Sequence, residues 1–219
     1  METHSQTPPP LLFDGPADGP TLVLAHGAGA PMDSPFMAIV AAGLGAAGVR
    51  VARFEFPYMH ARRVDGSRKA PDREPQLRAA WQRVIADLGG GGRLWIGGKS
   101  LGGRIASLIA DEVGARGLVC LGYPFRPPGA ADAAGSSRPD RRIAHLRDLR
   151  TPTLIVQGTR DPFGGQSEVA AYTLAAGVRV HWIADGDHSF KPRKSSGRTE
   201  AQNLAEAVEV VAAFVLAGS

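Results

Sequence analysis

Three residues suited to nucleophilic chemistry occur along this sequence in the order serine, aspartate, histidine. Ser100 lies within Gly-Lys-Ser-Leu-Gly at 98–102, which matches the pattern G-x-S-x-G. A serine hydroxyl is a weak nucleophile unless an adjacent base takes its proton. We expect His188 to be this base, and Asp161 to hold its imidazole in the required tautomer and stabilise its charged form.

The residues around the pentapeptide strengthen the interpretation of Ser100 as a nucleophile. An apolar, strand-like run precedes it at 94–97, and a helical pattern begins near Gly103. Small residues on both sides of the serine let strand and helix approach in a sharp turn, and the amide of Leu101 is predicted to be one oxyanion donor. A glycine-rich turn with an incidental serine is the weaker alternative. A phosphate-binding loop is excluded, because it would need glycine where Arg93 stands.

Asp161 and His188 each follow a separate apolar run, as expected for loops at the carboxyl edge of a parallel sheet. Taken singly, Asp161 could be a turn residue beside Pro162, and His188 a solvated loop residue. Three suitable residues in the right order after three separate runs favour the joint role. Asp185 and Asp187 are alternative acids, ranked lower because a side chain on the same loop rarely orients that histidine as well.

The other candidate residues indicate no cofactor and no metal. His26 ends the first apolar run and is interpreted as structural, whereas the amide of Ala28 is predicted to be the second oxyanion donor. A dinucleotide fingerprint in this loop would need glycine where Met32 stands. Cys120 lies inside an apolar run and is expected in the core rather than as a nucleophile. No histidine or cysteine cluster has the spacing of zinc ligands.

Six short apolar runs alternate with helical patterns. Runs that are apolar on both faces indicate parallel strands buried between two helical layers. The sequence therefore predicts an α/β fold, a mostly parallel six-stranded sheet flanked by helices. Helix starts are marked by Ser34 with Pro35, and by a capping box of Thr199 and Gln202. The runs are 21–25, 49–54, 94–97, 117–121, 153–157 and 178–183; the third helical stripe extends to Val113, and a fourth contains Val169, Tyr172 and Leu174.

Composition predicts one folded domain at 11–219 after a disordered tail at 1–10. The chain has 219 residues, 43% of them hydrophobic, and no apolar run long enough to span a bilayer. The tail lacks the features of a secretory signal, and a single cysteine fits a reducing cytoplasm. The irregular stretch from Arg126 to Asp140 is either a lid or a disordered loop. The net charge of +4 comes from scattered arginines, so we expect neither a nucleic-acid nor a membrane partner.

With these residues placed, the sequence resembles the α/β-hydrolase superfamily near its dienelactone-hydrolase-like members. It is most similar to a branch of small bacterial predicted hydrolases shared with a testis-expressed mammalian protein. The resemblance implies a minimal, largely capless version of the fold, with the early antiparallel strands mostly missing. Dienelactone hydrolase itself has cysteine at the elbow where this chain has Ser100, so the resemblance does not extend to its substrate. The stretches that carry it are HGAGAPMDSPFM at 26–37, RFEFPYM at 53–59, GGKSLGGRIAS at 97–107, CLGYPF at 120–125, PTLIVQGTRDPFG at 152–164 and DGDHSFKPRK at 185–194.

These features predict a cytoplasmic serine hydrolase, carboxylesterase-like, that cleaves a small-molecule ester or related acyl bond through an acyl-enzyme. The alternative is a non-catalytic interaction module on the same scaffold, since fold alone does not fix function. A monomer or homodimer is expected. Lys191, Arg193 and Lys194 either favour an anionic substrate or form a solvated loop. Six residues are predicted to line the substrate pocket, about half of them capping the core instead: Tyr58, Met59, Tyr123, Phe125, Phe163 and Phe190.

Overall fold

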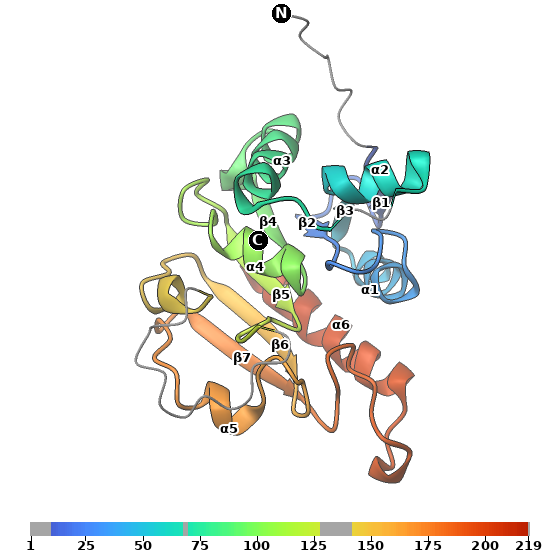
Figure 1. Ribbon diagram of the computed structural model, residues 1–219, viewed down its shortest axis with the longest axis vertical. Coiled ribbons are helices and arrows are strands. Elements are labelled where there is room, and N and C mark those ends of the chain that lie inside the picture. The colour runs from blue at the N-terminus through green and yellow to red at the C-terminus, as the bar shows by residue number, and fades with distance from the viewer. Residues whose placement is uncertain (1–9, 68–69, 128–141, 219) are drawn as a thin grey trace, which may run out of the picture.

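The computed structural model describes residues 10–67, 70–127 and 142–218. In this part of the chain a twisted sheet runs through the molecule, and helices lie on both of its faces (Figure 1). The strands are β1 (Leu12–Asp14), β2 (Thr21–Ala25), β3 (Arg50–Phe54), β4 (Leu94–Lys99), β5 (Gly117–Leu121), β6 (Thr153–Gly158) and β7 (Val178–Ile183). The α-helices are α1 (Pro35–Ala46), α2 (Pro57–Asp65), α3 (Glu74–Asp87), α4 (Leu101–Ser107), α5 (Gln166–Val169) and α6 (Glu200–Ala217).

The sheet has the order β1-β3-β2-β4-β5-β6-β7, so β4 occupies its centre. Strands β2 to β7 run parallel to one another, as predicted from the six apolar runs. The seventh strand, β1, pairs antiparallel with β3 at the sheet edge. The predicted count of six was therefore one strand short. The reason is length, because three residues, two partly buried and one exposed, leave no apolar run to recognise.

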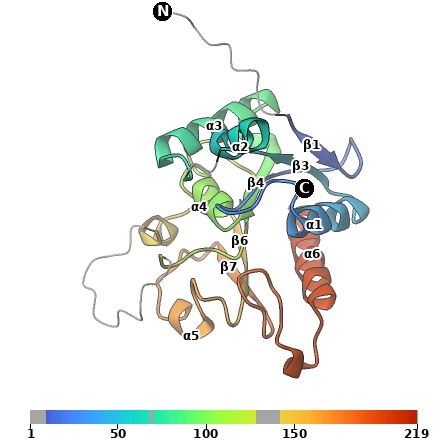
Figure 2. The same cartoon turned by 45° about the vertical axis from the view of Figure 1, so that its right-hand side comes forward.

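Successive residues of the central strands face opposite helical layers. Val23 and Ala25 of β2 pack with Trp81 of α3 in one apolar cluster, whereas Leu22 and Leu24 pack in a second cluster with helices α1 and α6. These two helices lie side by side (Figures 1 and 2). Burial on both faces explains why the strands read as continuous apolar runs.

Three helical predictions differ from the structure. Helix α2 was not predicted, because its N-cap is Phe56 and its first turn begins within the aromatic segment at 54–58, so no polar N-cap marks its start. The third stripe was expected to remain helical to Val113, but α4 ends at Ser107, whose hydroxyl binds the carbonyl of Arg104 and so competes with helical bonding. The fourth helix is limited to α5, and Tyr172 and Leu174 lie beyond it.

The predicted helix starts are confirmed for the first and last helices. Ser34 occupies the N-cap position of α1, with Pro35 at the first helical position, although the Ser34 side chain makes no capping hydrogen bond. Thr199 and Gln202 form the predicted capping box of α6, with the Gln202 amide donating to the Thr199 hydroxyl at 3.2 Å.

Two predictions fall on parts of the chain that the structure does not describe. The expected tail at 1–10 lies outside the described residues except for Pro10, and the possible lid lies outside them except for Arg126 and Pro127. Among the helices of the described segments, none combines the length and apolar character needed to cross a membrane.

Candidate active site

Ser100 occupies the turn between β4 and α4 at the centre of the sheet. Its amide donates to the carbonyl of Leu121, at the end of β5, over 3.0 Å. Its backbone has φ 49° and ψ −111°, a conformation that residues with a side chain rarely adopt. Leu101 is the first residue of α4, where a backbone N–H has no partner within the helix. A strained turn thus places a hydroxyl beside an unpaired helical amide.

The two glycines of the pentapeptide allow β2 to approach this turn. A Cβ atom at Gly98 would lie 2.2 Å from the carbonyl oxygen of Ala25, and one at Gly102 would lie 2.4 Å from the same oxygen. Both distances are far shorter than any real contact of a Cβ atom. The small residues in G-x-S-x-G are therefore required by close packing of strand, turn and helix.

Asp161 and His188 meet at the same edge of the sheet. Nδ1 of His188 lies 2.8 Å from Oδ2 of Asp161, while Oδ1 of Asp161 accepts a hydrogen bond from the Phe163 amide at 2.8 Å. The side chain of Asp161 is fully buried. An ionised carboxylate only accepts hydrogen bonds, so in the neutral imidazole Nδ1 carries the proton and Nε2 is an acceptor. A base that takes a proton from serine needs this tautomer.

The alternative acids on the histidine loop have other partners. Asp187 accepts hydrogen bonds from the backbone amides of Ser189 and Lys191 and so shapes the turn. Asp185 forms an ion pair with Arg193, which lowers the pKa of Asp185 below its ordinary value. Within the described segments, Asp161 is the carboxylate that contacts the imidazole.

Ser100 and His188 line one cavity of about 320 Å³ at the carboxyl edge of the sheet. Its opposite wall comes from the glycine- and alanine-rich loop after β2 and from the first turn of α1. Ala28, the predicted second oxyanion donor, belongs to this wall, and Lys191, Arg193 and Lys194 do not line the cavity. The lining residues are Gly27, Ala28, Gly29, Ala30, Ser34, Phe36, Met37, Lys99, Ser100, Phe163, His188 and Ser189.

Of the six aromatic or apolar residues predicted to line the pocket, Phe163 alone lines this cavity within the described chain. Its ring lies edge-on to the imidazole of His188, with centroids 4.5 Å apart. The other five are at most 2% exposed and pack in the core, because aromatic residues at strand ends serve packing as readily as binding. These five are Tyr58, Met59, Tyr123, Phe125 and Phe190.

Three cavity residues with large side chains were not predicted from the sequence. Phe36 and Met37 lie in the first turn of α1 and were not among the residues predicted to line the pocket. Lys99 precedes Ser100, at a position that the pattern G-x-S-x-G leaves open. Its side chain is 8% exposed, and Nζ donates to the backbone carbonyl of His188 over 2.6 Å. A lysine at the end of an apolar strand, directly before the nucleophile, was the signal in the sequence.

Hydrogen bonds from His26 and Tyr58 fix the loop after β2. His26 accepts the Phe56 amide at Nε2 over 3.1 Å, and its Nδ1 lies 2.7 Å from the Gly27 carbonyl. Burial lowers the pKa of His26, which favours the neutral imidazole that both contacts require. The hydroxyl of Tyr58 donates to the carbonyls of Gly27 and Ala28 over 3.3 and 3.1 Å. His26 therefore has the structural position expected of it, and Tyr58 supports the cavity wall.

Other potentially reactive groups are occupied or buried. Burial raises the pKa of the Cys120 thiol well above its ordinary range, so the thiolate is disfavoured. His145 binds the Ser107 hydroxyl at 2.8 Å, and His181 contacts Glu206 at 2.9 Å. Across the described residues, no group of three or more histidines, cysteines or acidic side chains is arranged to hold a metal ion.

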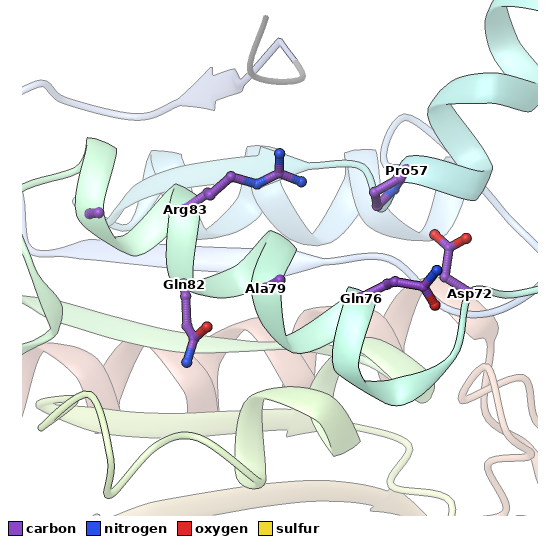
Figure 3. A pocket seen from close by; sticks show the side chains of 7 residues that line it. Pro57, Asp72, Gln76, Ala79, Gln82 and Arg83 are labelled. Carbon is purple, nitrogen blue, oxygen red and sulfur yellow. The ribbon is translucent and has the colours of Figure 1, made fainter. Parts of the chain in front are cut away.

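A second pocket, of about 690 Å³, lies over α3 and away from Ser100 (Figure 3). Asp72 accepts the Tyr58 amide at 2.9 Å, which fixes the start of α2. The lining includes no nucleophile and no histidine, so this pocket offers no counterpart of the Ser100 chemistry. Its lining residues are Pro57, Asp72, Gln76, Ala79, Gln82, Arg83 and Ala86.

Several solved structures share this fold. A serine hydrolase without a lid from Xanthomonas campestris aligns with a TM-score of 0.63 and 19% identity, over 93% of this chain and 87% of that one. Dienelactone hydrolase from Anabaena variabilis aligns with a TM-score of 0.68 and 19% identity, over 94% and 91%. Est1E from Butyrivibrio proteoclasticus, with ferulic acid bound, aligns with a TM-score of 0.68 and 16% identity, over 95% of both chains.

At these identities the likeness shows the shared fold. The sequence itself also matches the family model of the alpha/beta hydrolase domain, over residues 18–216. This match covers the whole sheet from β2 onward, together with the Ser100 turn and the loops that carry Asp161 and His188. The chain therefore belongs to the alpha/beta hydrolase domain family.

Proposed function

We propose that this chain is a serine hydrolase that cleaves a carboxylic ester through an acyl-enzyme intermediate. The observation that carries the proposal is the 2.8 Å contact between His188 and the buried carboxylate of Asp161, on the wall of the cavity that Ser100 also lines. The contact leaves Nε2 of His188 as the basic nitrogen on this wall. Family membership supports a hydrolase, and the residues of the cavity support this particular chemistry.

In the first half-reaction, Oγ of Ser100 attacks the carbonyl carbon of the ester while Nε2 of His188 takes the hydroxyl proton. The tetrahedral intermediate then collapses, and the departing alcohol receives that proton from His188. In the second half, His188 deprotonates a water molecule that attacks the acyl-enzyme, and the carboxylic acid leaves as Ser100 regains its proton. Asp161 stabilises the imidazolium formed twice in each cycle.

The negative charge on the tetrahedral oxygen needs hydrogen-bond donors. The proposed donors are the amides of Leu101, at the start of α4, and of Ala28, in the loop that Tyr58 and His26 hold. Such donors are effective because they are already oriented before charge develops on the oxygen. Removing one donor in comparable sites costs roughly 10²–10³-fold in kcat.

The size and composition of the cavity support a short, uncharged acyl group. A volume of about 320 Å³ is at the small end for ligand pockets. Phe36, Met37 and Phe163 are the large apolar residues of its lining, and the loop at 27–30 contains only glycine and alanine. We therefore expect hydrolysis of p-nitrophenyl acetate and butyrate to exceed that of the decanoate, measured as kcat/KM across the series.

A fluorophosphonate probe tests the nucleophile directly. We expect the wild-type chain to be labelled at Ser100, and Ser100→Ala to remain unlabelled with an unchanged circular dichroism spectrum. Ser107→Ala is the matched control, since this serine is 2% exposed and binds the Arg104 carbonyl, and it should leave labelling intact. Absence of labelling in a folded wild-type chain would overturn the proposal and favour a non-catalytic interaction module.

Two further proposals accompany this function. The single cysteine supports a cytoplasmic location, which cell fractionation would test. A monomer or homodimer remains our prediction for the assembly, and light scattering would measure it.

A further inference from the structure

Lys99 is a charged residue in a place that strands normally fill with apolar side chains. It ends β4, in which every residue is buried, and it directly precedes Ser100. Lysine is almost never buried without a partner, because moving an ammonium group out of water is costly. We therefore expect the ammonium group of Lys99 to have a specific hydrogen-bond partner.

The contact is with the loop that carries the proposed base. Nζ of Lys99 donates to the backbone carbonyl oxygen of His188 over 2.6 Å, across 89 positions of the chain. The same group lies 5.4 Å from the centre of the Phe36 ring, on the facing wall of the cavity. Because Lys99 is covalently attached to Ser100, this hydrogen bond joins the backbone beside the nucleophile to the backbone of the base.

The surroundings leave little room for another arrangement. A Cβ atom at Gly122 would lie 2.8 Å from Nζ of Lys99 and 3.2 Å from Nδ1 of His188, so ammonium and imidazole both press against this glycine. On the other side, a Cβ atom at Gly27 would lie 3.5 Å from Cγ of Lys99. The lysine therefore lies between the loop after β2 at 27–30, which we call the oxyanion loop, and the loop that carries His188.

The ammonium group has no direct counter-ion among the described residues. The charged groups that act on it are Asp161, after β6, and Asp187, after β7; both favour its protonated form. Burial acts more strongly in the opposite direction and lowers the pKa of Lys99 to about 8. The carbonyl of His188 accepts the hydrogen bond from Nζ. This hydrogen bond is charge-assisted while Lys99 is protonated.

We propose that Lys99 is a positioning residue, whose ammonium group fixes the His188 backbone so that the imidazole keeps its place relative to Ser100 during both proton transfers. This role rests on the proposed hydrolase function. Lys99 does not act on the substrate; it acts through His188. A neutral amine is a weaker donor, so the clamp loosens as Lys99 loses its proton.

The first test is the Lys99→Met variant, which keeps the length of the side chain and removes the donor and the charge. We expect kcat for p-nitrophenyl acetate to fall about 10–100-fold with KM changed less than threefold, because misplacing a catalytic group slows the reaction rather than binding. Lys191→Met is the matched control, since this exposed lysine lies on the loop that carries His188 but does not line the cavity. It should retain kcat within twofold.

The second test is the pH profile, which a merely structural role would not change. Wild-type kcat should decline above pH 8, and Lys99→Met should lack this decline while Lys191→Met keeps it. A wild-type profile that stays flat from pH 7 to 9.5 overturns the positioning role even if no variant folds. Full activity in folded Lys99→Met also overturns it. A loss of kcat in Lys99→Met as complete as in Ser100→Ala overturns it as well, because Lys99 would then be the base itself.

The outcomes also separate this role from the proposed function. A folded wild-type chain that neither hydrolyses esters nor reacts with fluorophosphonate removes both. A wild-type chain that is labelled, with Lys99→Met equally fast at every pH, removes the role of Lys99 alone.

Discussion

Two fully buried carboxylates at the same edge of the sheet have different partners, a guanidinium for Glu55 and an imidazole for Asp161. Glu55 follows β3 and contacts the guanidinium of Arg63 at 2.6 and 3.1 Å. Arg63 also binds Asp33, at 2.8 and 3.0 Å, so one cation serves two carboxylates. Asp161 follows β6 and instead contacts an imidazole, with the Phe163 amide as its second donor.

The two pairs differ in whether the partner of the carboxylate keeps its charge. Arg63 keeps its charge, whereas the imidazole of His188 can exchange a proton. The pKa of Arg63 is raised by its hydrogen bonds to Glu55 and Asp33, so the guanidinium of this cluster stays charged. It attaches α2 to the loop before α1, and its contribution is to stability. The imidazole beside Asp161 can gain and lose a proton, so this pair suits catalysis better than stabilisation. Substitutions at the two carboxylates should therefore have separable effects.

The largest effect is expected for Asp161→Asn, which should lower kcat about 10³–10⁴-fold with the fold retained. An asparagine amide can donate to Nδ1 and so favours the tautomer in which Nε2 carries the proton and cannot accept one from Ser100. Steady-state hydrolysis of p-nitrophenyl acetate measures this. Asp187→Asn, the matched control on the neighbouring loop, should cost less than tenfold. The reverse ranking would identify Asp187 as the acid.

The next effect concerns Lys99, a buried charge that forms no ion pair within the described residues. Its pKa is about 8 in the folded chain against 10.5 for an unperturbed lysine. Below pH 8 both folded and unfolded chains hold the proton, and burial of the charge opposes folding. As the pH rises from 8 to 10.5, the folded chain releases its proton first, so the free energy of unfolding of the wild type rises relative to Lys99→Met.

Urea unfolding of wild type and Lys99→Met at several pH values measures this linkage. The difference between the two free energies of unfolding should change by about 2–3 kcal/mol from pH 7 to pH 10, in favour of the wild type. The lost hydrogen bond to His188 affects both pH values and largely cancels. Parallel stability curves would mean that Lys99 is solvated in the folded chain.

A smaller effect is expected for Glu55→Gln, which should lower the free energy of unfolding by about 1–2 kcal/mol. Breaking a buried ion pair costs roughly 3–5 kcal/mol when a buried charge is left unpaired. Here Arg63 is 40% exposed and keeps Asp33, so the cost is lower. The kcat value should stay within threefold of wild type. A loss of activity without a loss of stability would remove the distinction between the two carboxylates.

Much of the fold could be predicted because the central strands are buried on both faces. β2, β5 and β7 begin and end where the apolar runs do, and the capping box at Thr199 marks the start of the last helix. β1 was not predicted, because a strand of three residues at a sheet edge, with Phe13 exposed, carries no periodic signal. α5 was overextended because three apolar residues at helical spacing also fit a turn, and the Tyr172 side chain packs on Phe125 without helical backbone.

The site could be predicted in part, for a related reason. Ser100, Asp161 and His188 have side-chain chemistry that few other roles need, so their types and order were informative. The aromatic residues of the proposed pocket were not, since Tyr123 and Phe125 satisfy the core as readily as a substrate. Lys99 was missed because the pattern G-x-S-x-G leaves its position open and its partner is a backbone carbonyl 89 positions away, so only its charge at the end of an apolar strand marked it.

Tyr58 lies between the two regions and should give the smallest effect. It belongs to α2, which the Arg63 cluster holds, and its hydroxyl donates to the carbonyls of Gly27 and Ala28 in the oxyanion loop. Tyr58→Phe keeps the buried ring and removes both hydrogen bonds. Because the loop would still be held through His26, we expect kcat to fall only about three- to tenfold, with stability changed by about 1 kcal/mol.

An inhibitor that mimics the tetrahedral intermediate distinguishes this positioning effect from general loosening. A boronic acid bound to Ser100 should lose affinity in Tyr58→Phe by the same factor as kcat/KM, because both depend on the oriented amide of Ala28. Tyr172→Phe, which removes a hydroxyl bound to Glu168 outside the cavity lining, should change neither quantity. If Tyr58→Phe loses stability but binds the boronic acid as tightly as wild type, the oxyanion loop does not depend on this hydroxyl. Helix α2 would then contribute to stability, through the ion pairs of Arg63 with Glu55 and Asp33, and not to catalysis.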